Sequence, residues 1–255
     1  MAEIVFENLS KRFTTKDGTV EALKNINLSI EKGDIYGIIG MSGAGKSTLV
    51  RCINLLERPT EGKVYVEGEE LTAMSPKELR QRRKKIGMIF QQFNLFAART
   101  VYENIAFPLR KSKLSKKEKQ EKVKQLLKLV ELEEKADVYP SQLSGGQKQR
   151  LSIARAIAKH PDVYIFDDSF SALDYKTDAV LRKELKAKTK DSTVMIAAQR
   201  ISTILHAEQI IVLDDGQIVG KGTHKELLKS CEAYYQIASS QLSEKELEAD
   251  MKEVD

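Results

Sequence analysis

The sequence is poor in the residue types that cross-link small proteins, bind zinc or span membranes. Of 255 residues only two are cysteines, Cys52 and Cys231, and none is tryptophan. These cysteines lie far apart without partners at metal-ligand spacing, so neither a disulfide scaffold nor a zinc site is supported. No apolar run approaches the roughly 18 residues of a transmembrane helix, and the N-terminus MAEIVFENLS does not resemble a signal peptide. We therefore expect a cytosolic protein with reduced thiols.

A strong surplus of one charge is also missing. The 42 basic residues exceed the 37 acidic ones by five, and a hydrophobic content of 41% is ordinary for a globular chain. Part of the basic surplus lies in two runs, Arg80–Lys85 and Lys111–Lys124, and no aromatic residues alternate with it. We therefore interpret these runs as solvated helix faces rather than as a nucleic-acid groove.

The apolar pattern predicts an α/β protein. Short alternating segments at Ile4–Leu9, Leu28–Ile30 and Val64–Val66 predict strands near the N-terminus, and a buried strand over Asp34–Gly40 leads into a helix that begins near Lys46. Residues 94–158 show a helical pattern. Further strands are predicted at Val163–Phe166, Thr193–Ala197 and Ile210–Leu213, with a helix near Asp178–Lys190, which is the alternation typical of a parallel sheet.

The most specific local motif is GMSGAGKS over residues 40–47, which matches G-x-x-x-x-G-K-[ST] between a strand and a helix. Glycines allow backbone N–H groups to approach phosphate oxygens, and the positive end of a helix dipole adds to the attraction. The lysine of this motif reaches the β- and γ-phosphates, and its serine binds Mg²⁺. The residues expected to hold the nucleotide here are Gly40, Ser42, Gly43, Ala44, Gly45, Lys46, Ser47 and Thr48.

Two further segments point to the same chemistry. Leu143-Ser144-Gly145-Gly146-Gln147 is a second glycine turn before a helical pattern and offers a second backbone anion site. The run VYIFD, residues 163–167, places Asp167 at the carboxyl end of a buried strand, where a magnesium ligand belongs. The histidines His160, His206 and His224 lie outside these motifs, and we expect them to be surface or capping residues.

With these motifs the sequence resembles the ATP-binding subunits of ABC transporters over nearly the whole chain. LSGGQ corresponds to the signature of that family, Gln91 to its Q-loop glutamine, and Ser171-Ala172-Leu173-Asp174 to its D-loop. The resemblance implies that Phe13 stacks on adenine and that Ser47, Gln91 and Asp167 bind magnesium. It also implies a head-to-tail pairing of two copies, or of a copy and a related subunit, around ATP. In that pairing the residues of one copy that close over ATP on the other are Ser144, Gly145, Gly146 and Gln147, with Asp174 nearby.

The resemblance breaks at two positions that concern hydrolysis. The residue after the strand aspartate is usually a glutamate that polarises the attacking water, and here it is Asp168. The histidine expected after the next strand is Gln199, which can donate a hydrogen bond but cannot exchange a proton as histidine does. A carboxylate misplaced by about 1 Å can lose on the order of 100-fold in rate. Slow hydrolysis supported by Lys46, Asp168 and Gln199 is therefore expected.

The two parts of the chain resemble different branches of the family. The segments up to YPSQLSGGQKQR are similar to amino-acid importers of the methionine type. The segments from DDSFSALDYKTDAV onward are similar to the degenerate half of a heterodimeric multidrug exporter. The changeover falls near residues 143–155, and our hypothesis is an engineered recombinant joined at the signature helix, with natural divergence as the alternative.

These observations lead to one expected organisation. The fold is a P-loop NTPase core of the ABC type with a mostly parallel sheet, an N-terminal antiparallel region and an inserted helical subdomain. We expect the core at 1–93 and 159–240, the helical subdomain at 94–158 and an acidic tail, either a frayed helix or irregular, at 241–255. ATP and Mg²⁺ are the expected ligands, and transmembrane subunits at the inner membrane are the expected partners. Two alternatives remain open: an ATP-gated regulatory module with little turnover, and a soluble ABC protein that acts on nucleic acid.

Overall fold

The structure is a computed structural model that describes residues 2–16, 18–170 and 192–252. It divides into two compact units, the first formed by Met1–Lys84 with Ser192–Asp255 and the second by Lys85–Asp191. The second unit is larger than the helical segment 94–158, because it also includes two strands that pair with each other.

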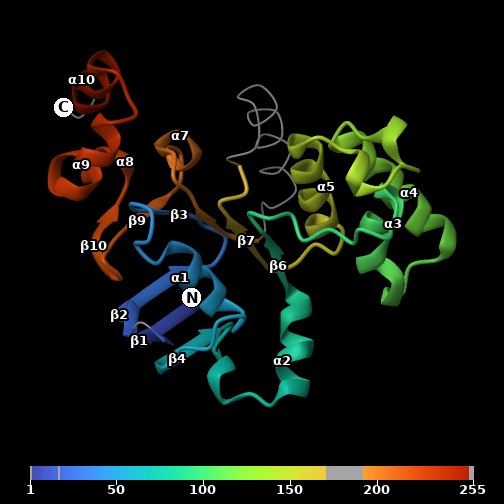
Figure 1. Cartoon of the computed structure of the whole chain (residues 1–255), viewed down its shortest axis with the longest axis horizontal. Coiled ribbons are helices and arrows are strands. Elements are labelled where there is room, and N and C mark those ends of the chain that lie inside the picture. The colour runs from blue at the N-terminus through green and yellow to red at the C-terminus, as the bar shows by residue number, and fades with distance from the viewer. Residues whose placement is uncertain (1, 17, 171–191, 253–255) are drawn as a thin grey trace. The chain divides into compact units, whose positions relative to one another are not determined.

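Ten strands and nine α-helices are defined among the described residues (Figure 1). The strands are β1 (Ala2–Thr15), β2 (Gly18–Glu31), β3 (Ile35–Ile39), β4 (Glu61–Val66), β5 (Glu69–Glu70), β6 (Ile86–Ile89), β7 (Val163–Asp167), β8 (Thr193–Ala197), β9 (Gln209–Asp214) and β10 (Gln217–Gly222). The helices are α1 (Lys46–Ile53), α2 (Pro76–Arg82), α3 (Val101–Ala106), α4 (Lys116–Leu129), α5 (Gly145–Ile157), α7 (Ile201–Ile204), α8 (His224–Ser230), α9 (Glu232–Ser239) and α10 (Glu244–Lys252).

The N-terminal antiparallel region of the first unit is confirmed. Its strands lie in the order β2-β1-β4-β5, with β1 paired to both β2 and β4. β1 and β2 are longer than the predicted segments, because cross-strand pairing continues through Phe13 and Val20 to the turn before Gly18. Irregular pairing near Leu9 and Lys11 separates the inner half of this hairpin from its outer half.

A parallel sheet forms the core of the first unit. β3 lies between β8 and β9 and runs parallel to both, and β10 adds an antiparallel edge beyond β9. A central strand is covered on both sides, which explains why Tyr36–Ile39 are all buried and apolar or glycine. The predicted strands at 193–197 and 210–213 are thereby confirmed.

The second unit combines a parallel strand pair with helices. β6 and β7 are parallel, with Ile89 beside Phe166 at their carboxyl ends. α3 begins at Val101 after a capping box formed by Thr100 and Glu103, so the helical pattern expected from residue 94 starts too early. Phe93 and Asn94 have left-handed φ values of 61° and 47°, which do not continue an α-helix.

The C-terminal segment of the first unit forms helix α10 over Glu244–Lys252, which is the helical alternative of the expectation for residues 241–255. α10 begins after Ser243, which shares a capping interaction with Glu246, and His224 Nε2 lies 3.1 Å from Asp250 Oδ2. His224 is only 6% exposed and its Nδ1 lies 2.7 Å from the Tyr234 hydroxyl. The expectation that His224 is a surface or capping residue is therefore wrong, because three helices enclose it.

The basic run 80–85 is also only partly a solvated face. Arg82 forms ion pairs with Glu67 and Glu69, and its side chain is 11% exposed. Arg83 donates to the backbone carbonyls of Asn54 and Leu55 at 2.8 Å each. These arginines tie α2 and the turn after it to the rest of the first unit.

Candidate nucleotide-binding site

The glycine motif lies where the sequence predicts, in the turn from β3 to α1. Gly45 precedes α1 with φ 100°, and Gly43 has φ 85°, both in the left-handed region that favours glycine. A Cβ at Gly45 would come within 2.5 Å of the Ala22 carbonyl oxygen, whereas a Cβ at Gly43 would meet no described atom within 4 Å. The turn is therefore packed from behind at Gly45 and open at Gly43.

Gly40 closes the turn against the neighbouring strand. A Cβ there would lie 2.1 Å from the Leu213 carbonyl oxygen of β9, so only glycine fits. Lys46 is 9% exposed, and its Nζ donates to the Gly40 oxygen at 2.7 Å and to the Met41 oxygen at 2.8 Å. The ammonium group is thus folded back over its own loop.

The remaining residues of this loop differ in exposure. Ser42 is exposed and Ala44 is buried, while Ser47 and Thr48 in the first turn of α1 are partly exposed. Backbone N–H groups in the first turn of an α-helix have no acceptor within the helix. The loop therefore combines an open glycine turn, a helix start and a lysine, which is the chemistry of a polyphosphate site.

Phe13 lies near the outer end of β1 in the same unit. It is half-buried, and its cross-strand partner Val20 is 62% exposed, which is unusual for a valine. Sequence reasoning did not select Val20, although an apolar residue directly after the polar residues 14–19 was a possible signal. Phe13 and Val20 form an apolar cross-strand pair near the outer end of the hairpin.

Gln199 follows β8 and is exposed. Its backbone oxygen accepts a hydrogen bond from Gln241 Nε2 at 2.8 Å, and Gln241 Oε1 accepts one from the Ile201 amide at 2.9 Å. The side chain of Gln241 therefore holds the loop that contains Gln199. No local pattern indicated this role, since Gln241 and Gln199 lie 42 residues apart.

In the second unit, the carboxyl ends of β6 and β7 bring together two predicted site residues. Gln91 follows β6 by two residues, Asp168 directly follows β7, and Gln91 Nε2 donates to Asp168 Oδ2 at 3.1 Å. Ser169 Oγ donates to the Ile89 oxygen at 2.9 Å and fixes the same junction. Asp168 has a left-handed φ of 48°, so this carboxylate stands on a strained turn.

Asp167 ends β7 and is fully buried, as the sequence predicts for the last residue of an interior strand. The signature turn begins α5, where Ser144 Oγ accepts from the Gln147 amide and Gln147 Oε1 accepts from the Ser144 amide. A Cβ at Gly145 would meet no described atom within 4 Å, so Gly145 stands at an open helix start. Asp174 lies outside the described residues.

Metal sites made by side chains alone are not evident in the described part of the chain. It contains no cluster of three or more histidine, cysteine, aspartate or glutamate residues arranged for a metal. Within the same residues, no helix is both long and apolar enough to cross a bilayer.

Comparison with known proteins identifies the family. Residues 23–171 match the family model described as ABC transporter. The chain is 49% identical over 222 residues to methionine import ATP-binding protein MetN 3 of Oceanobacillus iheyensis, which covers 86% of this chain and 65% of that protein. It is 48% identical over 227 residues to MetN 1 of Bacillus cereus, covering 88% of this chain and 66% of that protein. The chain thus spans just under two thirds of the length of these relatives.

Solved structures show the same fold. The dimeric ATP-binding cassette MJ0796 bound to ADP and Pi matches with a TM-score of 0.82 and 37% identity over 86% of this chain and 98% of that one. A bacterial Atm1-family exporter with ATP bound matches with a TM-score of 0.83 and 28% identity over 95% of this chain and 42% of that one. From the family match, the curated relatives and these structures, we conclude that the chain belongs to the ABC transporter family and has the fold of its ATP-binding cassettes.

Proposed function

We propose that the chain is an ATP-binding and ATP-hydrolysing subunit of an ABC transporter, related in role to the methionine importers. The observation that carries this proposal is the turn at residues 40–47, which is open at Gly43 and tightly packed at Gly40 and Gly45. Such a turn admits phosphate oxygens to backbone amides on one side only. Relatives named as methionine import ATP-binding proteins and a cassette with bound ADP and Pi support the same ligand.

Each residue of the loop has a proposed role toward ATP. The amides of Ser42, Gly43, Gly45 and Lys46 would face the phosphates, while the Ala44 amide donates to the Met41 oxygen at 3.2 Å and holds the turn. Gly40 allows the close turn, and Thr48 extends the contact along α1. Lys46 Nζ exchanges its two carbonyl contacts for β- and γ-phosphate oxygens, because a charged acceptor forms the stronger hydrogen bond. Phe13, with Val20 beside it, stacks on adenine.

The donor set fits magnesium. The hydroxyl of Ser47, the amide oxygen of Gln91 and the carboxylate of Asp167 are hard oxygen donors, which Mg²⁺ prefers, and the ion usually keeps waters and phosphate oxygens as its other ligands. Bound Mg²⁺ would neutralise charge on the β- and γ-phosphates. Asp167 is fully buried at the strand end, so its orientation is set by β7.

Hydrolysis is proposed to be slow. Asp168 would accept the proton of the attacking water, but its side chain is one methylene shorter than a glutamate, and its Oδ2 is engaged with Gln91 at 3.1 Å. Gln199 would donate to the γ-phosphate without exchanging a proton. A base held about 1 Å from its best position loses on the order of 100-fold.

A second copy, or a related subunit, is proposed to complete the site. Ser144, Gly145, Gly146 and Gln147 would close over the γ-phosphate of ATP on the partner, with Asp174 at the same interface. In this chain the Ser144–Gln147 capping interaction presents the start of α5 toward such an anion. The solved MJ0796 cassettes are dimers, which supports this arrangement.

Transmembrane subunits are the proposed partners, which would place the chain in the cytoplasm at the inner membrane. The second unit has an open cavity of about 450 Å³ lined by Phe96, Ala97, Ala98, Arg99 and Glu103. Phe96 is 37% exposed there and could contact an apolar side chain of a partner. A helical segment of a membrane subunit that also carries a basic residue opposite Glu103 would fit this cavity. Methionine import is the proposed direction and substrate, on the similarity to MetN proteins.

The recombinant hypothesis also remains a proposal. It rests on the resemblance of the segments from DDSFSALDYKTDAV onward to the degenerate half of a heterodimeric exporter, whereas the segments up to YPSQLSGGQKQR resemble methionine importers. If the junction is artificial, a membrane partner that docks well need not couple to hydrolysis.

Phosphate release under Mg-ATP tests the proposal. We expect Lys46→Met to abolish measurable turnover, a loss of about 100-fold or more, since one preorganised charge at the transition state is worth that much. Asp168→Glu combined with Gln199→His should raise turnover by about 10- to 100-fold. Lys128→Met, which removes a lysine charge from the exposed face of α4, is the matched control and should leave turnover unchanged.

The outcomes separate the two candidate functions. Turnover that rises in the double variant supports an impaired ATPase. ATP binding without turnover in either protein favours a nucleotide-gated binding module, for which the altered residues Asp168 and Gln199 are the supporting observation. Fast turnover that the substitutions leave unchanged contradicts the claim that this site is impaired.

A further inference from the structure

Lys11 lies beside the proposed adenine-stacking residue, on the same face of β1. Its Nζ is 4.7 Å from the centroid of the Phe13 ring, which is within the distance of a cation–π contact. The Lys11 side chain is only 15% exposed, so this cation is largely withdrawn from water. Residues two apart on a strand point to the same face, which explains how the pair forms.

The ammonium group is held in this position by the loop between α1 and β4. Lys11 Nζ donates to the Arg58 backbone oxygen at 2.8 Å and lies 3.4 Å from Glu57 Oε2. A lysine with two fixed partners keeps a single rotamer, so its charge stays over the ring. One face of Phe13 is therefore covered by a cation before any nucleotide arrives.

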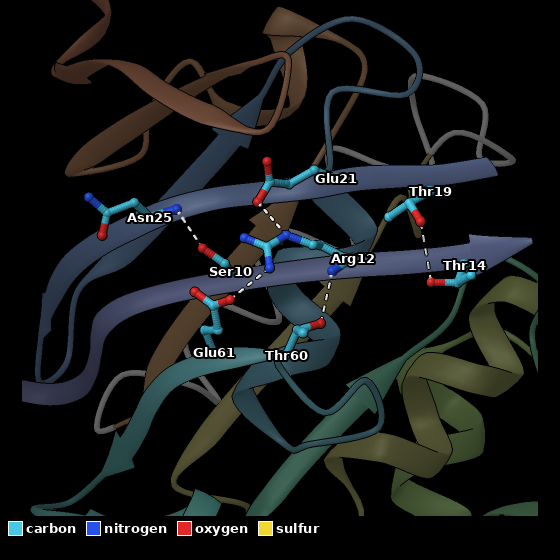
Figure 2. Close-up of polar contacts among 8 residues, drawn as sticks. All are labelled: Ser10, Arg12, Thr14, Thr19, Glu21, Asn25, Thr60 and Glu61. Atoms are coloured by element: carbon cyan, nitrogen blue, oxygen red, sulfur yellow. Dashed lines mark hydrogen bonds and ion pairs between the residues drawn. The ribbon is translucent and has the colours of Figure 1, made fainter.

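The strand that carries both residues is itself fixed on its opposite face. Arg12 Nε donates to Glu21 at 2.9 Å and Arg12 Nη1 to Glu61 at 2.7 Å, which links β1 to β2 and β4 (Figure 2). These two carboxylates raise the pKa of Arg12. The Arg12 amide also donates to Thr60 Oγ1 at 3.0 Å (Figure 2). This clamp limits how far Lys11 and Phe13 can move.

From this geometry we propose that Lys11 is a positioning residue for the base of the nucleotide and acts through Phe13. The cation leaves only the opposite ring face for the base and draws π-electron density away from that face. Because two electron-rich faces repel each other when stacked, this loss of density favours stacking with adenine. The inference rests on the proposed function, in which Phe13 contacts the base of ATP.

Two ligands separate this role from simple attraction of phosphate. ATP has both base and triphosphate, whereas inorganic tripolyphosphate has no base. If Lys11 acts through Phe13, its removal lowers the affinity for ATP alone. If it contributes only positive charge, its removal lowers the affinities for ATP and tripolyphosphate equally. Binding is measured by calorimetry on the full chain, with Mg²⁺ present and each variant checked for its folded state by circular dichroism.

The main variant is Lys11→Gln, because an amide can still donate to the Arg58 oxygen while the charge over the ring is removed. We expect ATP to bind about 3- to 10-fold more weakly, with tripolyphosphate changed by less than about twofold. Lys11→Arg retains a cation over the ring and should restore ATP affinity. In a Phe13→Leu background, Lys11→Gln should cause no further loss.

The control is Lys63→Met, which removes one charge from the same unit at a lysine that pairs with Glu70 and is 53% exposed. It should change neither affinity. Three results would each overturn the inference. In the first, Lys11→Gln weakens the binding of ATP and of tripolyphosphate by the same factor, and in the second it leaves the affinity for ATP unchanged. In the third, it weakens ATP binding in the Phe13→Leu background as much as in the wild type. If the wild-type chain binds neither ligand, the proposed function is wrong. The titration of the wild type alone therefore separates this failure from a failure of the inference about Lys11.

Discussion

Alanine substitutions at Gly43 and Gly45 should damage two different properties of the same loop. Both residues have left-handed φ values, 85° and 100°, so each alanine costs about 1–2 kcal/mol in backbone strain. At Gly45 the new methyl group also lies 2.5 Å from the Ala22 oxygen and 3.0 Å from Leu23 Cδ2. Displacing β2 there adds about 1–3 kcal/mol, as overpacking does elsewhere.

Thermal unfolding and ATP titration measure the two effects. One kcal/mol corresponds to about 2–4 °C in a chain of this size, so Gly43→Ala should lower the midpoint by roughly 2–8 °C and Gly45→Ala by clearly more. The methyl group at Gly43 occupies the open side of the loop, where we place phosphate oxygens. Gly43→Ala should therefore remain folded at 25 °C and lose about 10-fold or more in ATP affinity.

Gly33 provides the matched control. Its φ is 87°, and a Cβ there would also meet no described atom within 4 Å, but it lies in the turn between β2 and β3. Gly33→Ala should show the same loss of stability as Gly43→Ala without any loss of ATP affinity. If Gly43→Ala bound ATP as the wild type does, phosphate would not lie against this loop, and the proposed function would have to be abandoned.

Three further predictions concern stability and reactivity. Burial raises the pKa of Cys52 to about 12, so iodoacetamide at neutral pH should leave Cys52 unmodified in the folded chain and modify it in urea, as read by peptide mass spectrometry; modification at equal rates would contradict this. Hydrogen bonds from Ser115 lower the pKa of Glu118, so the stabilisation from its carboxylate is complete above the usual glutamate pKa and is lost as the pH falls through the lowered pKa of the folded chain. Glu118→Gln should therefore weaken the acid dependence of urea unfolding, and an identical pH profile would refute the reasoning. His224→Phe leaves the buried Tyr234 hydroxyl without its His224 partner and should lower the free energy of unfolding by about 1–3 kcal/mol. Adding Tyr234→Phe to the same chain should recover much of this loss, and purely additive losses would show that the pair is not coupled.

The local sequence predicts well those elements whose residues are contiguous. The strand at 35–39 followed by the glycine turn could be recognised, because burial on both faces demands an uninterrupted apolar run and the turn demands glycine. β6 could not, since it has only four residues, Gly87 among them, and Met88 is half-exposed. Strands of this length are defined by their partner, here β7, rather than by their own pattern.

The sequence alone determined which functional groups the chain contains. These are a phosphate-binding turn, oxygen donors for magnesium, an aromatic residue for the base, and a carboxylate and an amide where the family usually has glutamate and histidine. Tertiary structure alone decided which of these groups meet. The bond between Gln91 and Asp168 spans 77 residues, and the contact of Gln241 with the Gln199 loop spans 42. Polar side chains at such separations have no periodicity to reveal them, because strand pairing and helix packing, rather than neighbours in the chain, bring them within hydrogen-bonding distance.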